Sequence, residues 1–458
     1  MNQISLEKSI RNFRFRLTRS QLWKGELWSA SEIRLRRAKF IRSVHAEYKE
    51  ALEIIVEAQL EVEGELASAS TQERGKIEHW KAILELCFNA LVWIALKWER
   101  DHVKRLFTGP KYGTLKSRNA KSALHVVNRM NEVWSDFAIP LDFARFESAA
   151  DILRVRFDPT KETVSQEFIE VKEGRVNSAI LDTVRGGTQE DYLRFFDSYG
   201  KHGVKQIERY FRQAKKLKKA LEMMTAKEGD SFDTTEGKLF IFEPKRPSIR
   251  YSDGMSRLLK YLRRRAFGTF IVDNCLLVGG FRVDKPESLS IGEFLFRHQA
   301  HHIFSPECAF CADANGRDWM GKFAAVNIFD GCAMFGSVPF DGLITRPVSD
   351  SDMLDLLFGR IRLMFYLDGD RFIELCKVLG LDAGYSTGKE TNRLRSQGSK
   401  GLVEFGAQFI WMKKKDHELT AYVSEGMLHD MCLNWVHPYW WVSEHAAMSA
   451  MVSSRRHG

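Results

Sequence analysis

The sequence predicts a mixed α/β (α+β) protein with a helical N-terminal region, a central mixed sheet flanked by helices, and a C-terminal α/β domain. Three observations support this fold class. Across residues 1–110, apolar residues recur at spacings of three and four, as in the stretch 51–58, and Gly and Pro are few. Residues 151–172 have the pattern of a β-hairpin, and helical and extended patterns alternate after residue 236.

The composition is that of a soluble globular protein with two or three domains. The chain has 458 residues, of which 44% are apolar and 28% charged. Lys and Arg total 69 against 60 Asp and Glu, which gives a net charge of +9 and a pI near 9.1. This excess suits a polyanionic partner but does not require one.

The sequence indicates a cytoplasmic protein that does not bind membranes. Seven cysteines with irregular spacing predict reduced thiols, and the basic residues 1–42 lack the apolar core of a secretory signal. The longest apolar run, residues 83–96, contains Glu85 and Asn89 and is too short to span a bilayer. It is predicted to form a buried helix.

Two polar breaks divide the chain. Residues 109–113 (GPKYG) are the strongest loop signal in the first third, and residues 227–235 (KEGDSFDTT) are polar and contain Gly. We therefore expect a helical region over 1–110, a core over 111–230 that begins with a helix at Ser117–Trp134, and a C-terminal domain over 236–458.

The central hairpin is predicted from strand and turn propensities. Residues 151–157 are rich in Ile, Leu, Val and Phe, residues 158–163 (DPTKET) are turn formers, and residues 167–172 are again extended. A turn centred on residues 160–161 implies antiparallel partners whose numbers add to about 321. Asp151 should therefore lie across from the stretch 170–172.

Two carboxylates and an ammonium group would then converge at one end of the hairpin. Glu170 and Lys172 are two residues apart and share a face of their strand. Paired carboxylates hold Mg²⁺ while leaving positions for phosphate and water, and a lysine can orient the water. Asp158 competes with Asp151, but it lies at the turn, roughly 23 Å away at ~3.3 Å per residue. We therefore prefer Asp151.

These residues resemble a known family. Asp151 followed by Glu170-Val171-Lys172 resembles the core motif of the PD-(D/E)XK nuclease superfamily. Gln206 and Tyr210, in a segment of helical pattern, are similar to the QxxxY motif of its RecB-like branch. The stretch 122–127 resembles the helix in which that branch carries a metal-binding histidine, here His125.

The resemblance implies a restriction-endonuclease-like core and a role for each matched residue. Asp151 and Glu170 would ligate Mg²⁺ or Mn²⁺, Lys172 would position or activate the attacking water, and Gln206 with Tyr210 would hold DNA or the lysine. It implies a metal-dependent (endo)deoxyribonuclease of a prokaryotic defence, restriction or DNA-repair system, with DNA and possible further subunits as partners.

Structural alternatives stand beside these roles. Tyr210 can pack in a core while Gln206 covers a surface patch, because residues four apart share a helix face. A histidine on an apolar helix is more often a packed core residue than a ligand, and Glu132 is an alternative acidic ligand.

Three clusters of basic residues are candidates for phosphate contacts. The cluster after Tyr210 is the preferred DNA-binding segment because it follows the QxxxY-like motif. It comprises Arg209, Arg212, Lys215, Lys216, Lys218 and Lys219. The clusters at 34–42 and 257–265, like this one, can equally be solvated helix faces.

The C-terminal domain contains a candidate zinc site. The segment RHQAHHIFSPECAFC holds His298, His301 and His302 ahead of a C-x2-C pair, Cys308 and Cys311. Two histidines and two cysteines can complete a tetrahedral Zn²⁺ site, here most simply His298, His302, Cys308 and Cys311. The alternative is that the cysteines are small buried hydrophobic residues.

The other expected elements follow from periodicity. Helices are predicted at 178–184 and 189–199, with a helix stop at Gly186-Gly187, and a further helix that contains Gln206 is predicted to run to about residue 226. Further helices are expected at 256–265, 352–365 and 370–379, and strands at 238–242, 268–278, 405–412 and 418–423.

Two other functional classes remain open from the sequence. A nucleic-acid-binding or assembly subunit could carry a nuclease-like fold that is catalytically idle. Alternatively, the C-terminal domain could be a zinc-dependent sensor.

Overall fold

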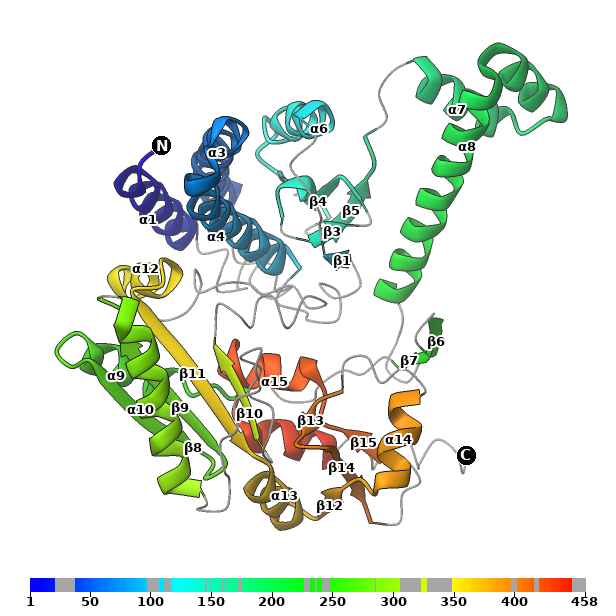
Figure 1. Cartoon of the computed structure of the whole chain (residues 1–458). Coiled ribbons are helices and arrows are strands. Elements are labelled where there is room, and N and C mark those ends of the chain that lie inside the picture. The colour runs from blue at the N-terminus through cyan, green and yellow to red at the C-terminus, as the bar shows by residue number, and fades with distance from the viewer. Residues whose placement is uncertain are drawn as a thin grey trace. The chain divides into compact units, whose positions relative to one another are not determined.

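The structure is a computed structural model of the whole chain (Figure 1). The structure describes residues 1–20, 38–96, 107–110, 117–144, 146–148, 150–158, 160–161, 163–171, 175–225, 231–234, 237–240, 248–284, 286–304, 323–327, 348–396, 402–415 and 420–446. The chain divides into two compact units, Met1–Ala226 with Pro339–Thr345, and Lys227–Val338 with Arg346–Gly458. We call them the N-terminal and C-terminal units. Both combine helices with small sheets, as the mixed fold class requires.

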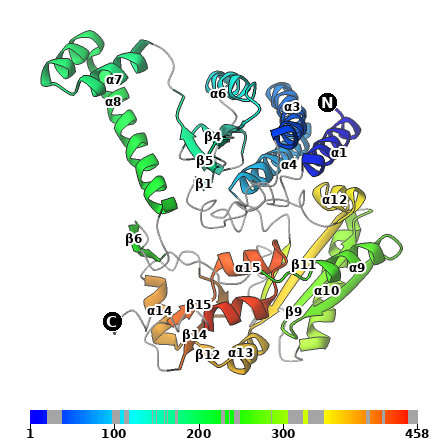
Figure 2. The same cartoon turned by 180° about the vertical axis from the view of Figure 1, so that it is seen from behind.

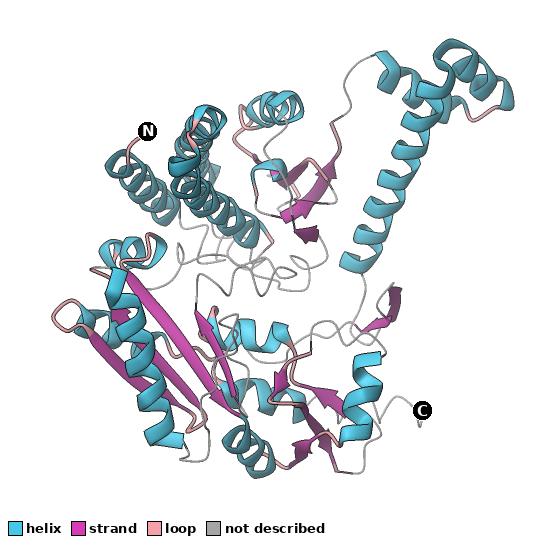
Figure 3. Ribbon diagram, viewed as in Figure 1, coloured by secondary structure: helices cyan, strands magenta, loops and turns pink. Residues whose placement is uncertain are grey.

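The N-terminal unit begins with helices and continues into short strands (Figure 3). Its elements are α1 (Gln3–Ser20), α3 (Ala38–Ser68), α4 (Thr71–Ala95), β1 (Phe107–Pro110), α6 (Ser117–Met130), β2 (Asp136–Pro140), η3 (Leu141–Phe143), β3 (Phe146–Ser148), β4 (Ile152–Asp158), β5 (Thr163–Ile169), α7 (Arg175–Gly186) and α8 (Gln189–Thr225). Gly109 and Pro110, expected in a loop, instead belong to β1, which pairs with β3 through an irregular register. An edge strand tolerates Pro because its outer N–H groups need no partner.

The apolar run in the first third forms a buried helix, as predicted. From Ile83 to Ala95 of α4, every residue except Glu85 is buried. Lys81, on the same helix, is paired with Glu63 of α3 at 2.7 Å, so its charge is compensated where it is buried. None of the helices in the described ranges is long and apolar enough to cross a membrane.

The central hairpin forms with the predicted register. β4 pairs antiparallel with β5, and each partner pair adds to 321, from Ile152 opposite Ile169 to Asp158 opposite Thr163. The second strand was expected at 167–172 and instead spans Thr163–Ile169, because the turn is tighter than expected. Glu170 and Val171 therefore follow the strand and do not belong to it. β2 completes a three-stranded sheet of order β2-β4-β5. All strand pairs among the described residues are antiparallel, so this sheet is not the mixed sheet expected for the core.

Glycines shape the two helices after the hairpin. α7 stops as expected at Gly186-Gly187, where Gly187 has φ +68° and its N–H donates to the Thr183 carbonyl at 2.9 Å. Gly200 kinks α8 with φ 53° and ψ −146°, a conformation open almost exclusively to glycine. The two halves of α8 and α7 then enclose a small apolar cluster of Ile180, Phe195 and Ile207.

The C-terminal unit contains a four-stranded sheet of order β10-β11-β9-β8 and a second sheet in which β14 pairs with β12, β13 and β15. Its elements are β6 (Ser231–Thr234), β7 (Gly237–Phe240), α9 (Ser252–Leu262), β8 (Phe267–Val272), β9 (Leu276–Arg282), α10 (Pro286–Phe304), β10 (Phe323–Asn327), α12 (Asp350–Leu357), β11 (Ile361–Asp368), α13 (Gly369–Val378), β12 (Leu381–Tyr385), α14 (Gly388–Ser396), β13 (Glu404–Phe405), β14 (Gln408–Lys414), β15 (Thr420–Tyr422) and α15 (Glu425–Cys432). Residues 438–446 form a further helix.

Three predictions for this unit were wrong. The single strand expected at 405–412 is a hairpin of β13 and β14, which turns at Gly406 with φ 65°. The single strand expected at 268–278 is a hairpin of β8 and β9, which turns at Asp273 and Asn274 with φ 47° and 56°. Two consecutive left-handed residues make the tight turn that joins such strands. The helix expected at 352–365 is the helix α12 followed by the strand β11. β11 is an inner strand buried on both faces, so its sequence has no alternation to mark it.

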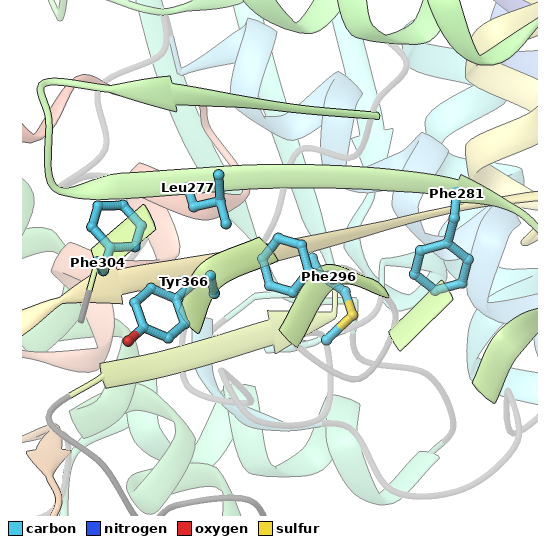
Figure 4. Close-up of a cluster of buried hydrophobic side chains, with 7 residues drawn as sticks. Leu277, Phe281, Phe296, Phe304 and Tyr366 are labelled. Carbon is cyan, nitrogen blue, oxygen red and sulfur yellow. The ribbon is translucent and has the colours of Figure 1, made fainter. Parts of the chain in front are cut away.

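Helices α9 and α10 cover opposite faces of this sheet. On β9, Gly279 faces Phe296 of α10, and the next residue, Gly280, faces Leu262 of α9. Figure 2 shows both helices beside β9 and β11. The α10 side contains the core cluster of Leu277, Phe281, Phe296, Ala300, Phe304, Met364 and Tyr366 (Figure 4).

The turn between β8 and β9 also anchors the end of the C-terminal unit. Asp273 accepts a hydrogen bond from the Tyr439 backbone N–H at 2.8 Å and is paired with Nδ1 of His437 at 3.1 Å. Trp435, two residues before His437, is fully buried and has φ 57°. No sequence pattern indicated this contact, which joins residues 164 positions apart.

The described cysteines are buried free thiols. They are Cys87, Cys275, Cys376 and Cys432. Burial raises the pKa of each thiol, because the thiolate loses its hydration. These four residues therefore have the properties of core side chains and not of nucleophiles.

Substituting Gly279 by Ala is expected to destabilise the C-terminal unit by about 1–3 kcal/mol, because overpacking displaces core side chains. The added Cβ would lie 2.2 Å from the Phe296 ring. Hydrogen exchange of the β9 amides reports the change. Gly388→Ala is the matched control, since nothing lies within 4 Å of a Cβ at that exposed position. Equal effects of the two substitutions would contradict the close approach of α10.

Candidate active site

Asp151 is held at the open end of the hairpin by its own backbone. Its N–H donates to the Ile169 carbonyl at 3.1 Å, and its carbonyl accepts from the Leu141 N–H at 2.8 Å. These bonds fix Asp151 between β5 and the turn η3. Because Asp151 directly precedes β4, its position follows from the hairpin register.

The Asp151 carboxylate lies against the segment that carries Glu170. Its Oδ2 accepts a hydrogen bond from the Val171 N–H at 2.7 Å, and Glu170 is the residue before Val171. Asp151 and Glu170 are both partly buried. The structure thus brings Asp151 and Glu170 to the same end of one hairpin, as predicted. Lys172 lies outside the described residues.

Asp158 occupies the opposite end of β4 and has a structural role there. Its Oδ1 accepts hydrogen bonds from the backbone N–H groups of Thr160 and Lys161 at 2.9 and 3.1 Å. Both bonds lower the pKa of Asp158, and the bond from Lys161 has the larger effect. The carboxylate stabilises the turn, and the choice of Asp151 over Asp158 agrees with this geometry.

His125 and Glu132 are both exposed. His125 projects from α6 on the side away from Ala123 and Val127, which are buried. The alternative of a packed core histidine is therefore wrong. Among the described residues, no group of three or more His, Cys, Asp or Glu side chains is arranged to hold a metal ion, so neither residue joins Asp151 and Glu170 in such a group.

Gln206 and Tyr210 share a face of α8. Tyr210 packs against the cluster formed by α7 and α8 and lies 5.7 Å, ring to ring, from Phe211. Gln206 is partly buried one turn before it. The described contacts of Tyr210 favour the packing alternative, and a role of either residue at Asp151 and Glu170 stays a prediction.

The basic segment of α8 presents its side chains to solvent. Arg209, Arg212, Lys215 and Lys218 are all exposed, and their spacing of three places them along one side of the helix. Lys218 is 3.9 Å from Glu222, a pair exposed on both sides. The side chains of Lys216 and Lys219 lie outside the described set. The exposed segment is compatible with phosphate binding and with a solvated face.

A charged ladder on the other face of the sheet was not predicted. Arg154 of β4 donates from Nε to Asp136 of β2 at 3.1 Å, with a second bond from Nη2, and from Nη1 to Glu167 of β5 at 3.0 Å. Asp136 is 1% exposed and also lies 3.5 Å from Arg156. The alternation of Arg154 and Arg156 with apolar residues was the available signal, because residues two apart share a face.

Only part of the predicted zinc site lies within the described residues. His298 and His302 are exposed on consecutive turns of α10, with ring centroids 4.6 Å apart. Cys308 and Cys311 lie outside the described residues, as does the side chain of His301. The four-ligand site is therefore still a prediction.

Comparison with known proteins identifies no relative. No protein-family model, curated protein or solved structure matches this chain.

Proposed function

We propose that the protein is a metal-dependent nuclease that hydrolyses phosphodiester bonds of DNA in the cytoplasm, with its active site at the open end of the β4–β5 hairpin. One observation carries the proposal. The Asp151 carboxylate lies 2.7 Å from the backbone nitrogen of Val171, the residue after Glu170, because the β4–β5 register places Asp151 across from this segment. The resemblance to the PD-(D/E)XK superfamily supports the same assignment.

The donor set suits a hard divalent cation. Asp151 and Glu170 offer carboxylate oxygens, and Mg²⁺ is commonly held by one or two carboxylates together with water and substrate phosphate. A bound Mg²⁺ or Mn²⁺ would supply Lewis-acid stabilisation of phosphate charge. Two protein ligands are therefore enough.

The chain itself would orient the site. The Val171 N–H donates to one oxygen of Asp151, which restrains the position of the carboxylate before any ligand arrives. Lys172 follows Val171 in the sequence, and its ammonium group would orient water or offset charge on the scissile phosphate. Preorganised groups of this kind favour the transition state without further rearrangement.

A plasmid-nicking assay tests the proposal. Purified full-length protein should convert supercoiled plasmid to open-circle or linear DNA with Mg²⁺ or Mn²⁺ and not with EDTA, and Lys172→Ala should abolish this conversion. Absence of cleavage with any divalent ion, on duplex DNA, single-stranded DNA and RNA, would overturn it. DNA binding without cleavage would then favour a catalytically idle binding subunit. If Lys172→Ala nicks plasmid as fast as wild type, the cleavage would come from a contaminant.

The exposed basic face of α8 gives this nuclease a surface for the DNA backbone. Replacing Arg209, Arg212 and Lys215 together by Gln removes three candidate phosphate contacts. The slope of the logarithm of the DNA-binding constant against the logarithm of the salt concentration is therefore expected to become shallower by about three, since each contact contributes roughly 0.9. Fluorescence anisotropy with a labelled duplex at several salt concentrations measures the slope.

The matched control removes the same charge elsewhere. Arg257, Lys260 and Arg264 are also exposed, at or just after α9. Their triple replacement by Gln should leave the slope unchanged. If both variants lower the slope equally, the effect is one of net charge and α8 is not the binding surface.

A further inference from the structure

The helix α10 has a fixed rotational setting in the C-terminal unit. Its inner face buries Gly292, Phe296, Ala300 and Phe304, spaced four residues apart. Figure 4 shows Phe296 and Phe304 in the core cluster with Leu277, Phe281 and Tyr366. A Cβ added at Gly292 would lie 2.2 Å from the Phe281 ring, so the helix packs very closely on the sheet. This packing determines which residues of α10 face outward.

Two imidazoles occupy the outward face. His298 and His302 are both exposed, lie four residues apart and contact each other edge to face, with an interplanar angle of 67°. Within the described part of the chain, neither imidazole has a hydrogen-bond or ion-pair partner. The Phe294 ring is 6.2 Å from the His298 ring on the other side. The two imidazoles therefore lie side by side and exposed on one helix face.

The C-terminal end of α10 is held in place next to the pair. Arg371 of α13 donates from Nη2 to the Ile303 carbonyl at 2.9 Å, and its guanidinium lies 4.8 Å from the centre of the Phe304 ring. Arg371 also donates to the Asn274 side chain at 2.8 Å. An unsatisfied carbonyl of the last turn is thus capped, and the turn that carries His302 does not have to become ordered when a ligand binds.

The spacing of the rings matches that of two imidazoles on one metal ion. With Zn–N bonds of about 2.0–2.1 Å, each ring centroid lies about 3.2 Å from the metal, so the centroids are about 4.5 Å apart at a right angle and about 5.2 Å at the tetrahedral angle. The observed 4.6 Å falls within this range.

We propose that His298 and His302 together bind one Zn²⁺ ion as a two-histidine chelate. Neutral imidazole is a favoured ligand of zinc and of other late first-row metals, whereas Mg²⁺ prefers oxygen. The site differs in ligand chemistry from the two carboxylates of the hairpin. It is therefore independent of the nuclease proposal.

Isothermal titration tests this site. Zn²⁺ is added to chelator-treated full-length protein without an affinity tag, in the presence of excess Mg²⁺ to occupy carboxylate sites. Wild type should bind one Zn²⁺ per chain at this site. His298→Gln and His302→Gln should each weaken that binding by at least about tenfold, the smallest loss expected when a group that supports a metal site is removed.

The control is His202→Gln, which removes an exposed histidine on α8 and should leave Zn²⁺ binding unchanged. Circular dichroism melts of metal-free variants show that folding is intact, as expected for exposed positions. Cu²⁺ substitution with electron paramagnetic resonance gives a second readout, in which the hyperfine pattern should lose one nitrogen in each variant. Wild-type affinity in both histidine variants, or no Zn²⁺ binding by wild type, would overturn the proposal.

Discussion

Replacing Asp151 by Asn is expected to lower Mg²⁺-dependent plasmid nicking by at least about 10²-fold, the loss typical of removing one preorganised electrostatic group from a catalytic site. Asn has the same shape, and its side-chain oxygen can still accept the Val171 N–H that Asp151 Oδ2 binds at 2.7 Å. The end of the hairpin should therefore persist while a metal-ligating charge is lost. Initial nicking rates under saturating Mg²⁺ measure the effect, and DNA affinity should remain near that of wild type.

The control for this variant lies on the same strand. Glu167→Gln also removes one carboxylate charge from β5, but Glu167 shares the opposite sheet face with Arg154 and is 42% exposed. Its nicking rate should stay within about twofold of wild type, because exposed ion pairs contribute little. Equal loss in the two variants would show that nicking depends on net charge or hairpin stability and not on Asp151.

Replacing Asp136 by Asn is expected to destabilise the sheet of the N-terminal unit by about 3–5 kcal/mol, the usual cost of removing one partner of a buried ion pair. Asp136 is 1% exposed and compensates Arg154, itself 17% exposed. Without the carboxylate, the Arg154 charge remains largely buried. Because the chain has two units, hydrogen exchange of the β2 and β4 amides measures this local stability better than a global unfolding curve.

Two further variants isolate the Asp136–Arg154 pair. Glu167→Gln removes the more exposed partner of the same arginine and should cost less than about 1 kcal/mol. Combining Asp136→Asn with Arg154→Met removes both charges and should recover much of the lost stability. If Asp136→Asn has no larger effect than Glu167→Gln, the ladder is not an important stabilising feature of this sheet.

The part of the candidate site that the sequence predicted is local. The turn-forming residues between β4 and β5 set the register, with Asp158 bonded to the amides of Thr160 and Lys161. Once the register is fixed, Asp151 must face the end of β5 where Glu170 lies. About 20 residues and one turn thus contain all the information required.

The contacts that sequence did not predict join distant segments or inner strands. His437 meets Asp273 across 164 residues, and Asp136 meets Arg154 through strands that pair only in the folded sheet. β11 has apolar residues on both faces, so it lacks the alternation of a strand and its sequence pattern predicts a helix. Such features depend on which elements become neighbours.

The sequence by itself determined the helical start of the chain, the buried helix of residues 83–95 and the hairpin that brings Asp151 to Glu170. These follow from local periodicity and turn chemistry. Only the tertiary structure decided that Tyr210 packs with α7, that Asp136 compensates Arg154, and that close packing of α10 turns His298 and His302 outward. The physical reason is that burial and pairing partners are properties of the whole fold, whereas turns and helix faces are properties of neighbouring residues.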